Sequence, residues 1–159
     1  MSLINLDSAL SLYSIPAIWL TAFYPAAMKT GILRDTPVGY NNLHPRGNVE
    51  RAKTAANVDK AAFQRAARCE GAHLNGMENL PIWFAAILAA HLAGLPNRTL
   101  NLVSAAYVVT RVVYNYVYIN QSTPAQGWLR SAAYFTGLAM PLGLLIQSAN
   151  KIHTVSLLL

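Results

Sequence analysis

The amino-acid sequence predicts an all-α membrane protein in which four transmembrane helices form one bundle. First, only 11% of its 159 residues are charged, whereas a typical soluble domain has about 25%. Second, segment 34–78 holds seven of the 12 Lys and Arg residues and five of the six Asp and Glu residues. Third, four apolar runs with at most one charge each approach the roughly 20 residues that a spanning helix needs. We therefore expect a single integral membrane domain over residues 1–159.

The first predicted helix covers residues 8–33. No charged residue lies between Asp7 and Lys29, and the run is rich in aliphatic and aromatic residues. Pro16 and Pro25 are expected to kink the helix, which neighbouring helices tolerate within a membrane. A cleaved signal peptide is the competing interpretation, but no basic residue precedes the run and no clear small-residue cleavage site ends it.

The second predicted helix covers residues 49–93 and starts outside the membrane. Alanines recur at helical spacing in its first part. The pattern continues into nineteen uncharged residues between Glu78 and Arg98, and Gly94 and Pro96 are typical helix stop signals. We expect a cytosolic helical extension that runs into the second span.

The third and fourth predicted helices cover residues 98–120 and 126–149. Arg111 interrupts the apolar residues of the third helix, and a polar segment that ends in Pro124 closes it. The fourth helix contains most of the twenty uncharged residues 131–150. Both helices have the length of a membrane span.

The loops predict the orientation of this multi-pass protein. The connection between the first two spans begins with the turn-rich segment 34–48 and carries seven cations, whereas the next connection has only Arg98. Cation-rich loops face the cytoplasm, so we expect the first loop to be cytoplasmic and both termini to lie on the opposite side. The expected membrane is the endoplasmic reticulum in a eukaryote and the inner membrane in a bacterium.

Composition also excludes several classes of partner. The net charge of +6 does not indicate a nucleic-acid partner, because the cations of segment 34–68 alternate with acids instead of forming a basic block. The single cysteine, Cys69, excludes an internal disulfide and a Cys-rich metal site. His73 and His91 have no partner at a metal-ligand spacing. We expect membrane lipid as a partner and no bound metal.

Polar residues recur at helical spacing near the cytoplasmic end of three predicted helices. They are Arg68, Gly71, Asn75 and Glu78 in the second, Arg111, Tyr114 and Tyr118 in the third, and Arg130, Ser131 and Tyr134 in the fourth. Ionisable groups inside spans are costly and usually functional. Together the three stripes are suited to a small, anionic, peptide-like ligand, because arginine binds carboxylates in bidentate fashion.

Structural interpretations of the same residues stay open. Glu78 can pair with Arg111 or Arg130 as a buried ion pair between helices. The tyrosines can be interfacial belt residues, and Arg130 can extend to lipid headgroups. In these interpretations the three stripes hold no ligand.

Several motifs resemble those of one membrane-protein superfamily. Segment 68–81, with its Ala-His-x-Asn-x-x-Glu pattern, resembles the signature of the MAPEG superfamily, the membrane-associated proteins of eicosanoid and glutathione metabolism. Segment 40–46 resembles the Asn-Pro-Arg loop of its bacterial-like and fungal branch. Segments 111–118 and 129–134 resemble the third- and fourth-helix patterns. The likeness runs in the same order along the chain over residues 34–147.

The resemblance implies a homotrimer of four-helix subunits, with the cofactor glutathione bound between neighbouring subunits. Asn75 and Glu78 would hold the glutathione backbone and amino group, and Arg130 would be the catalytic residue that stabilises the thiolate. The other cofactor-binding positions are Arg68, Arg111, Tyr114, Tyr118, Ser131 and Tyr134.

Three positions depart from the family pattern. Gly71 stands where several mammalian members have an arginine that holds glutathione, Tyr114 where several have histidine, and Leu43-His44 where Arg-Asn is more usual. We expect a transferase similar to microsomal glutathione transferases, which adds glutathione thiolate to an apolar electrophile from the bilayer. Peroxidase activity toward lipid hydroperoxides is compatible with the same site.

Two alternatives to this function stay open. One is an isomerase or cyclase of an apolar metabolite, with glutathione unconsumed or absent, and the space left by Gly71 favours it. The other is a non-enzymatic lipid-binding protein of the same architecture.

Overall fold

The computed structural model describes residues 5–157, and these residues contain helices and no strand. The elements are a 3-10 helix Leu10–Tyr13, α1 (Ser14–Arg34), a 3-10 helix Pro45–Gly47, α2 (Asn48–Thr54), α3 (Lys60–Leu92), α4 (Asn97–Asn120) and α5 (Pro124–Ser156). The predicted all-α class is confirmed.

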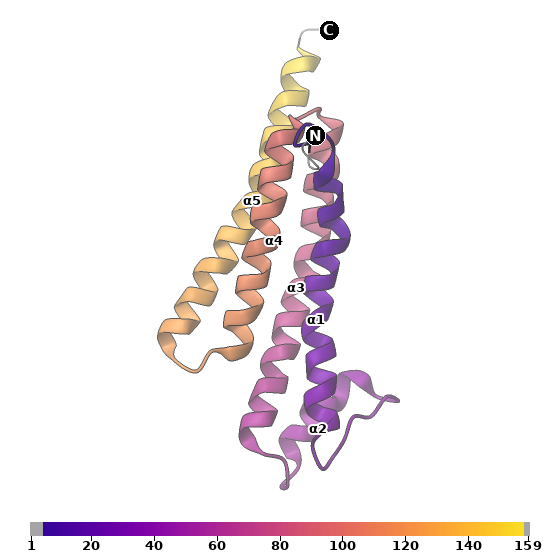
Figure 1. Ribbon diagram of the computed structural model, residues 1–159, viewed down its shortest axis with the longest axis vertical. Helices are drawn as coiled ribbons and strands as arrows, with labels where there is room; N and C mark the ends of the chain where they lie inside the picture. Colours follow the sequence, from indigo (N-terminus) through magenta and orange to yellow (C-terminus); the bar gives the residue numbers. More distant parts are fainter. Residues whose placement is uncertain (1–4, 158–159) are drawn as a thin grey trace.

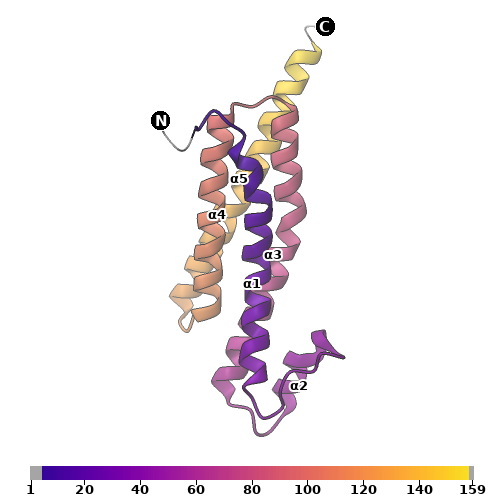
Figure 2. The ribbon, with the colours of Figure 1, turned by 45° about the vertical axis from the view of Figure 1, so that its right-hand side comes forward.

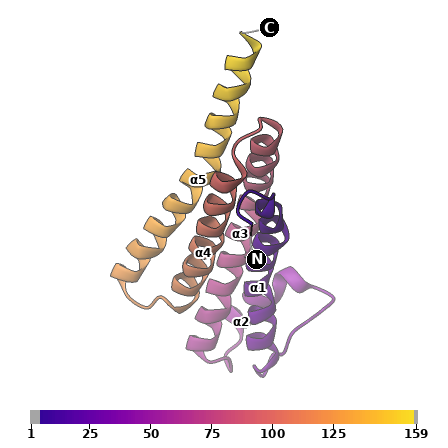
Figure 3. The same ribbon diagram turned by 45° about the horizontal axis from the view of Figure 1, so that its top comes forward.

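The four long helices lie side by side with alternating directions (Figures 1 and 2). α1 packs along α3, α3 along α5, and α4 along both α5 and α1. α5 extends past the other helices at its C-terminal end, and α2 lies at the opposite end of the bundle (Figures 1 and 3). The cation-rich connection between α1 and α3 is therefore at one end of an elongated molecule.

Two of the described helices, α4 and α5, are long and apolar enough to cross a membrane. The apolar content of α1 is lowered by Lys29 and Arg34, and that of α3 by the charged residues of its first half. The four-span arrangement and the homotrimer therefore stay predictions.

The predicted helix 49–93 is divided in two, which corrects the sequence interpretation. α2 ends at Thr54 because Ala55 has an extended backbone, with ψ 126°. α3 starts after Asp59, whose carboxylate accepts a hydrogen bond from the backbone N–H of Ala62 at 2.9 Å. Aspartate is a preferred N-cap residue, so it specifies a new helix start within an alanine-rich sequence.

The fourth predicted helix, 126–149, is longer in the structure. Thr123 accepts a hydrogen bond from the N–H of Gln126, and the Gln126 side chain accepts one from the N–H of Thr123. This capping box, with Pro124 as the first helical residue, defines the start of α5. The link between α4 and α5 is consequently only three residues long.

Small residues allow α1 and α3 to approach closely. A Cβ atom at Gly76 would lie 2.8 Å from the Cα of Ala22, so a side chain does not fit at this crossing. Near it, Lys29 of α1 forms a partly buried ion pair with Glu70 of α3, with 2.9 Å between Nζ and Oε1.

Pro25 determines two polar contacts of α1. Because proline has no N–H, the carbonyl of Thr21 loses its donor within the helix. Asn115 of α4 supplies another, since its Nδ2 donates to this carbonyl at 2.7 Å. One residue further, Nδ1 of His73 donates to the carbonyl of Ala22 at 2.8 Å. Neighbouring helices thus satisfy the backbone around the proline.

The main hydrophobic core lies between the four long helices. Its centre is Trp83 of α3, whose ring stacks on that of Tyr107 of α4 with 4.0 Å between centroids. The indole Nε1 donates to Ser14 Oγ of α1 at 3.1 Å. This packing fixes α3 and α4 relative to each other. From this core, both helices extend toward the end of the bundle that carries the charged connection.

Candidate functional site

Two hydrogen bonds join the polar stripes of α3 and α4. Nε of Arg68 donates to the carbonyl of Ile119 at 2.9 Å, and Nη2 of Arg111 donates to Oδ1 of Asn75 at 3.2 Å. The two bonds join corresponding positions of the helices: seven residues separate Arg68 from Asn75 in α3, and eight separate Arg111 from Ile119 in α4. The structure therefore brings the α3 and α4 stripes together.

The position of Gly71 is not an open space, contrary to the sequence interpretation. A Cβ atom there would lie 2.5 Å from the hydroxyl oxygen of Tyr118 and 3.1 Å from its Cζ. The tyrosine hydroxyl thus fills the volume that a side chain at position 71 would need. This removes the observation that favoured an isomerase pocket at Gly71.

An aromatic cluster joins α4 to α5. The Tyr114 ring lies 5.5 Å from that of Tyr118 and 6.2 Å from that of Tyr134, measured between centroids. The guanidinium of Arg111 lies 4.6 Å from the Tyr114 ring centroid, and that of Arg130 lies 5.1 Å from the Tyr118 ring centroid. Such cation–π contacts orient a guanidinium without neutralising its charge.

Arg111 is the most unusual member of this site. It is only 3% exposed, yet its contacts in the described chain are the neutral Asn75 amide and the Tyr114 ring. Between residues 5 and 157, the ion pairs are Lys29–Glu70 and Lys53–Glu50. A buried cation with no counter-ion is costly, so the site is suited to an anion from outside the subunit.

Two predicted site residues lie apart from this cluster. Glu78 is exposed on the single subunit, and in the described chain it forms no ion pair with Arg111 or Arg130. The half-buried Ser131 donates from Oγ to the carbonyl of Gly127 within its own helix at 3.1 Å. The buried ion pair considered for Glu78 is therefore not formed within the described chain.

Sequence reasoning missed polar residues at the mouth of the site. A hollow of about 440 Å³ beside Arg68 is lined by Gln64 and by the α4–α5 link, including Gln121. Oε1 of Gln121 is buried and accepts no hydrogen bond from the described residues. Gln64 lies four residues before Arg68, so extending the α3 stripe by one turn would have identified it.

The other reactive side chains are used in packing. His73 binds the carbonyl of Ala22, and Nε2 of His91 lies 2.8 Å from Ser11 Oγ. Cys69 is fully buried. Within the described part of the chain, no three His, Cys, Asp or Glu residues are grouped as metal ligands would be.

Comparisons with known proteins agree with the motifs described above. The model of the MAPEG family matches residues 9–150, which is most of the chain. No curated protein and no solved structure matches. The match spans the α3, α4 and α5 stripes, and we conclude that the chain belongs to the MAPEG family.

Proposed function

We propose that this protein is a glutathione-dependent membrane transferase that adds the glutathione thiolate to apolar electrophiles. The family includes glutathione transferases and related enzymes. The observation that carries the proposal is the buried Arg111 with no counter-ion in its own described chain. Glutathione has two carboxylates, so it supplies the missing negative charge.

The polar groups of the cluster match the other parts of this tripeptide. Asn75 keeps an amide Nδ2 to donate after Arg111 has taken its Oδ1. The tyrosine hydroxyls of the cluster are hydrogen-bond donors for peptide carbonyls. Arg130, half-buried at the start of α5, is a second guanidinium for an anionic group. The residues therefore fit a small, anionic peptide.

The thiol is the reactive group that glutathione supplies. A free thiol has a pKa of about 8.5, and the thiolate is the nucleophile. Arg130 would favour the thiolate through its positive charge in an apolar surrounding. Tyr118, which contacts the Arg130 guanidinium through its ring, would fix the direction of that charge. The S–H proton would leave to water at the charged end of the bundle.

Glu78 supports the proposed homotrimer. It is exposed on α3 between Leu74 and Leu80, beside the exposed Met77. A carboxylate facing lipid at this position is costly, and a neighbouring subunit that covers it removes that cost. In the proposed assembly, Glu78 faces the amino group of glutathione bound between subunits.

The decisive experiment measures binding and thiolate formation in detergent-purified protein. We expect glutathione binding at millimolar concentration or below, and thiolate absorbance that falls strongly in Arg130→Ala and partly recovers in Arg130→Lys. Arg98→Ala is the matched control, because Arg98 is exposed at the other end of α4. Absence of binding at millimolar glutathione would refute the proposal.

The same preparation distinguishes the two alternative functions. An apolar electrophile such as 1-chloro-2,4-dinitrobenzene should be consumed together with glutathione. Turnover of a lipid metabolite without glutathione consumption would indicate an isomerase or cyclase. Bound lipid without any turnover would indicate a non-enzymatic lipid-binding protein.

A further inference from the structure

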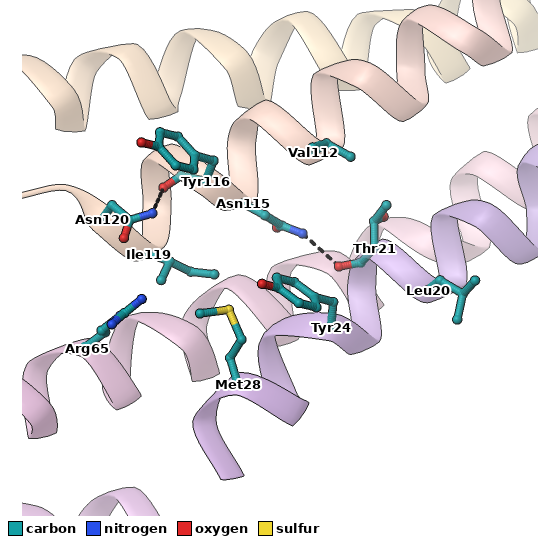
Figure 4. A pocket seen from close by; sticks show the side chains of 10 residues that line it. All are labelled: Leu20, Thr21, Tyr24, Met28, Arg65, Val112, Asn115, Tyr116, Ile119 and Asn120. Carbon is teal, nitrogen blue, oxygen red and sulfur yellow. Dashed lines mark hydrogen bonds between the residues drawn. The ribbon is translucent and has the colours of Figure 1, made fainter. Parts of the chain in front are cut away.

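A second hollow lies on the opposite side of α4 from the arginine–tyrosine cluster. It is a groove of about 630 Å³ between α1 and α4, open to the outside (Figure 4). Its lining residues are Leu20, Thr21, Tyr24, Met28, Arg65, Val112, Asn115, Tyr116, Ile119 and Asn120. None of them belongs to the site proposed for glutathione, so the groove has its own ligand or none.

A separate hollow lies further along the seam between the same two helices. Toward the N-terminal end of α1, a hollow of about 450 Å³ is lined by Tyr13 and Ala17 of that helix and its preceding turn, and by Ala105 and Val108 of α4. From Tyr13 to Met28 the seam is about 22 Å long at the rise of an α-helix. That length is a large part of the roughly 30 Å hydrocarbon core of a bilayer.

The ends of the groove differ in polarity. Figure 4 shows Arg65, Asn120 and Tyr116 at one end, with Leu20 and Val112 at the other. The polar end coincides with the charged end of the bundle, where α1 approaches its last turn and α3 begins. An elongated molecule with a polar head and an apolar tail matches this gradient.

The charged residues at the polar end of the groove indicate which kind of polar headgroup it can bind. Arg65 is exposed and forms no ion pair within the described chain. Lys29, on α1, is already neutralised by Glu70. Asp35 lines a separate small hollow together with Arg65, but the two form no ion pair in the described chain. The groove therefore ends at a cation that is available to an anionic headgroup.

We propose that the α1–α4 groove binds one acyl chain of an anionic phospholipid, with the phosphate against Arg65. The glycerol region lies near Met28, next to Arg65, and the acyl methylenes lie along Tyr24, Leu20 and Val112. The groove between two adjacent helices has room for a single acyl chain, because helix axes are about 8–10 Å apart. The lipid comes from the leaflet at the charged end of the bundle, where basic residues attract anionic headgroups.

The test uses the full chain in nanodiscs with equal parts of phosphatidylglycerol and phosphatidylcholine. Native mass spectrometry counts the lipids of each kind that stay bound after release. We expect the wild type to retain phosphatidylglycerol about fivefold over phosphatidylcholine, the preference that one basic residue gives. Arg65→Gln should remove the preference, and Arg34→Gln, which changes an exposed cation outside the groove, should keep it.

Two further variants exclude trivial explanations. Val112→Phe fills the groove and should lower retention of both lipids, whereas Val113→Phe, the same change one position away and outside the lining, should not. Asp35→Asn removes the competing acid and should raise the preference, a gain that misfolding does not produce.

Three results would overturn the proposal. One is an equal loss of preference in Arg65→Gln and Arg34→Gln, and another is equal retention in the two phenylalanine variants. The third is a changed oligomeric mass in Val112→Phe with unchanged lipid retention, which would assign the groove to a second copy of the chain. Glutathione binding is measured separately, so failure of this proposal leaves the transferase proposal unaffected.

Discussion

Lys29 and Arg111 are two buried cations that this protein treats in opposite ways. Lys29 is 7% exposed and has Glu70 at 2.9 Å. Arg111 is 3% exposed and has an amide and an aromatic ring as its contacts in the described chain. The α1–α3 contact therefore contains a complete ion pair, whereas the contact of α3 with α4 contains half of one.

We interpret the difference as one between a charge that stabilises the fold and a charge that belongs to the proposed ligand site. A partly buried ion pair such as Lys29–Glu70 joins two helices without any ligand, and its loss affects folding. A buried cation held by neutral groups costs stability in the empty protein and recovers it when an anion binds. Variants that remove the counter-ion of Lys29 or the charge of Arg111 test this interpretation directly.

The largest effect is expected at the complete pair. Glu70→Gln leaves Lys29 buried without a counter-ion, so we expect a loss of about 3–5 kcal/mol in the free energy of unfolding. Unfolding in detergent micelles, followed by circular dichroism, measures it. The double variant Lys29→Met with Glu70→Met should recover most of the loss. A single variant as stable as the wild type would contradict the assignment of this pair as structural.

A smaller effect is expected at Arg111, and it should appear in ligand affinity and not in stability. Arg111→Met removes an uncompensated charge, so the empty protein should be at least as stable as the wild type. Glutathione affinity should fall roughly 10- to 100-fold, the value of one or two charge-assisted hydrogen bonds. Calorimetric titration measures the affinity, with Arg98→Met as the exposed control. Strong destabilisation without loss of affinity would reverse the roles assigned to the two cations.

The smallest effect is expected at Gly71, next to the incomplete pair. Gly71→Ala must displace the Tyr118 hydroxyl, and we expect a roughly fivefold loss of glutathione affinity with little change in stability. In a Tyr118→Phe background the same substitution should have a smaller effect, because the hydroxyl is gone and the ring carbon Cζ at 3.1 Å is the closest atom left. Gly143→Ala is the matched control, because nothing lies within 4 Å of a Cβ there. Equal effects of Gly71→Ala in both backgrounds would exclude the proposed contact.

Helical periodicity predicted which residues share a polar helix face, but it did not predict which residues of other helices contact that face. The spacing of Arg68, Asn75, Arg111 and Tyr118 depends only on helix geometry, so the meeting of two polar stripes was predictable. The space beside Gly71 is filled because Tyr118 of α4 lies opposite it. The spacing of residues within α3 contains no information about the position of a residue on α4. Glu78 is exposed in the structure, and helical spacing does not report whether a second chain covers it in the proposed homotrimer.

Local chemistry explains the differences in helix bounds. The break between α2 and α3 is specified by one capping residue, Asp59, and alanine periodicity on both sides conceals it. The hydrogen bond from Asn115 to Thr21 follows from the N–H that Pro25 lacks. The proline was recognised in the sequence, but its compensating donor lies ninety residues away and required the tertiary structure.

The contact between Gly76 and Ala22 makes distant polar interactions sensitive to a single methyl group. A Cβ at position 76 would overlap both Cα and Cβ of Ala22, so α1 would have to move as a body. That movement would stretch the bond from His73 to Ala22, the pair of Lys29 with Glu70, and the bond from Asn115 to Thr21. Because the overlap includes the Cα of Ala22, even glycine at position 22 would not make room for a side chain at position 76, although neither residue has a functional group.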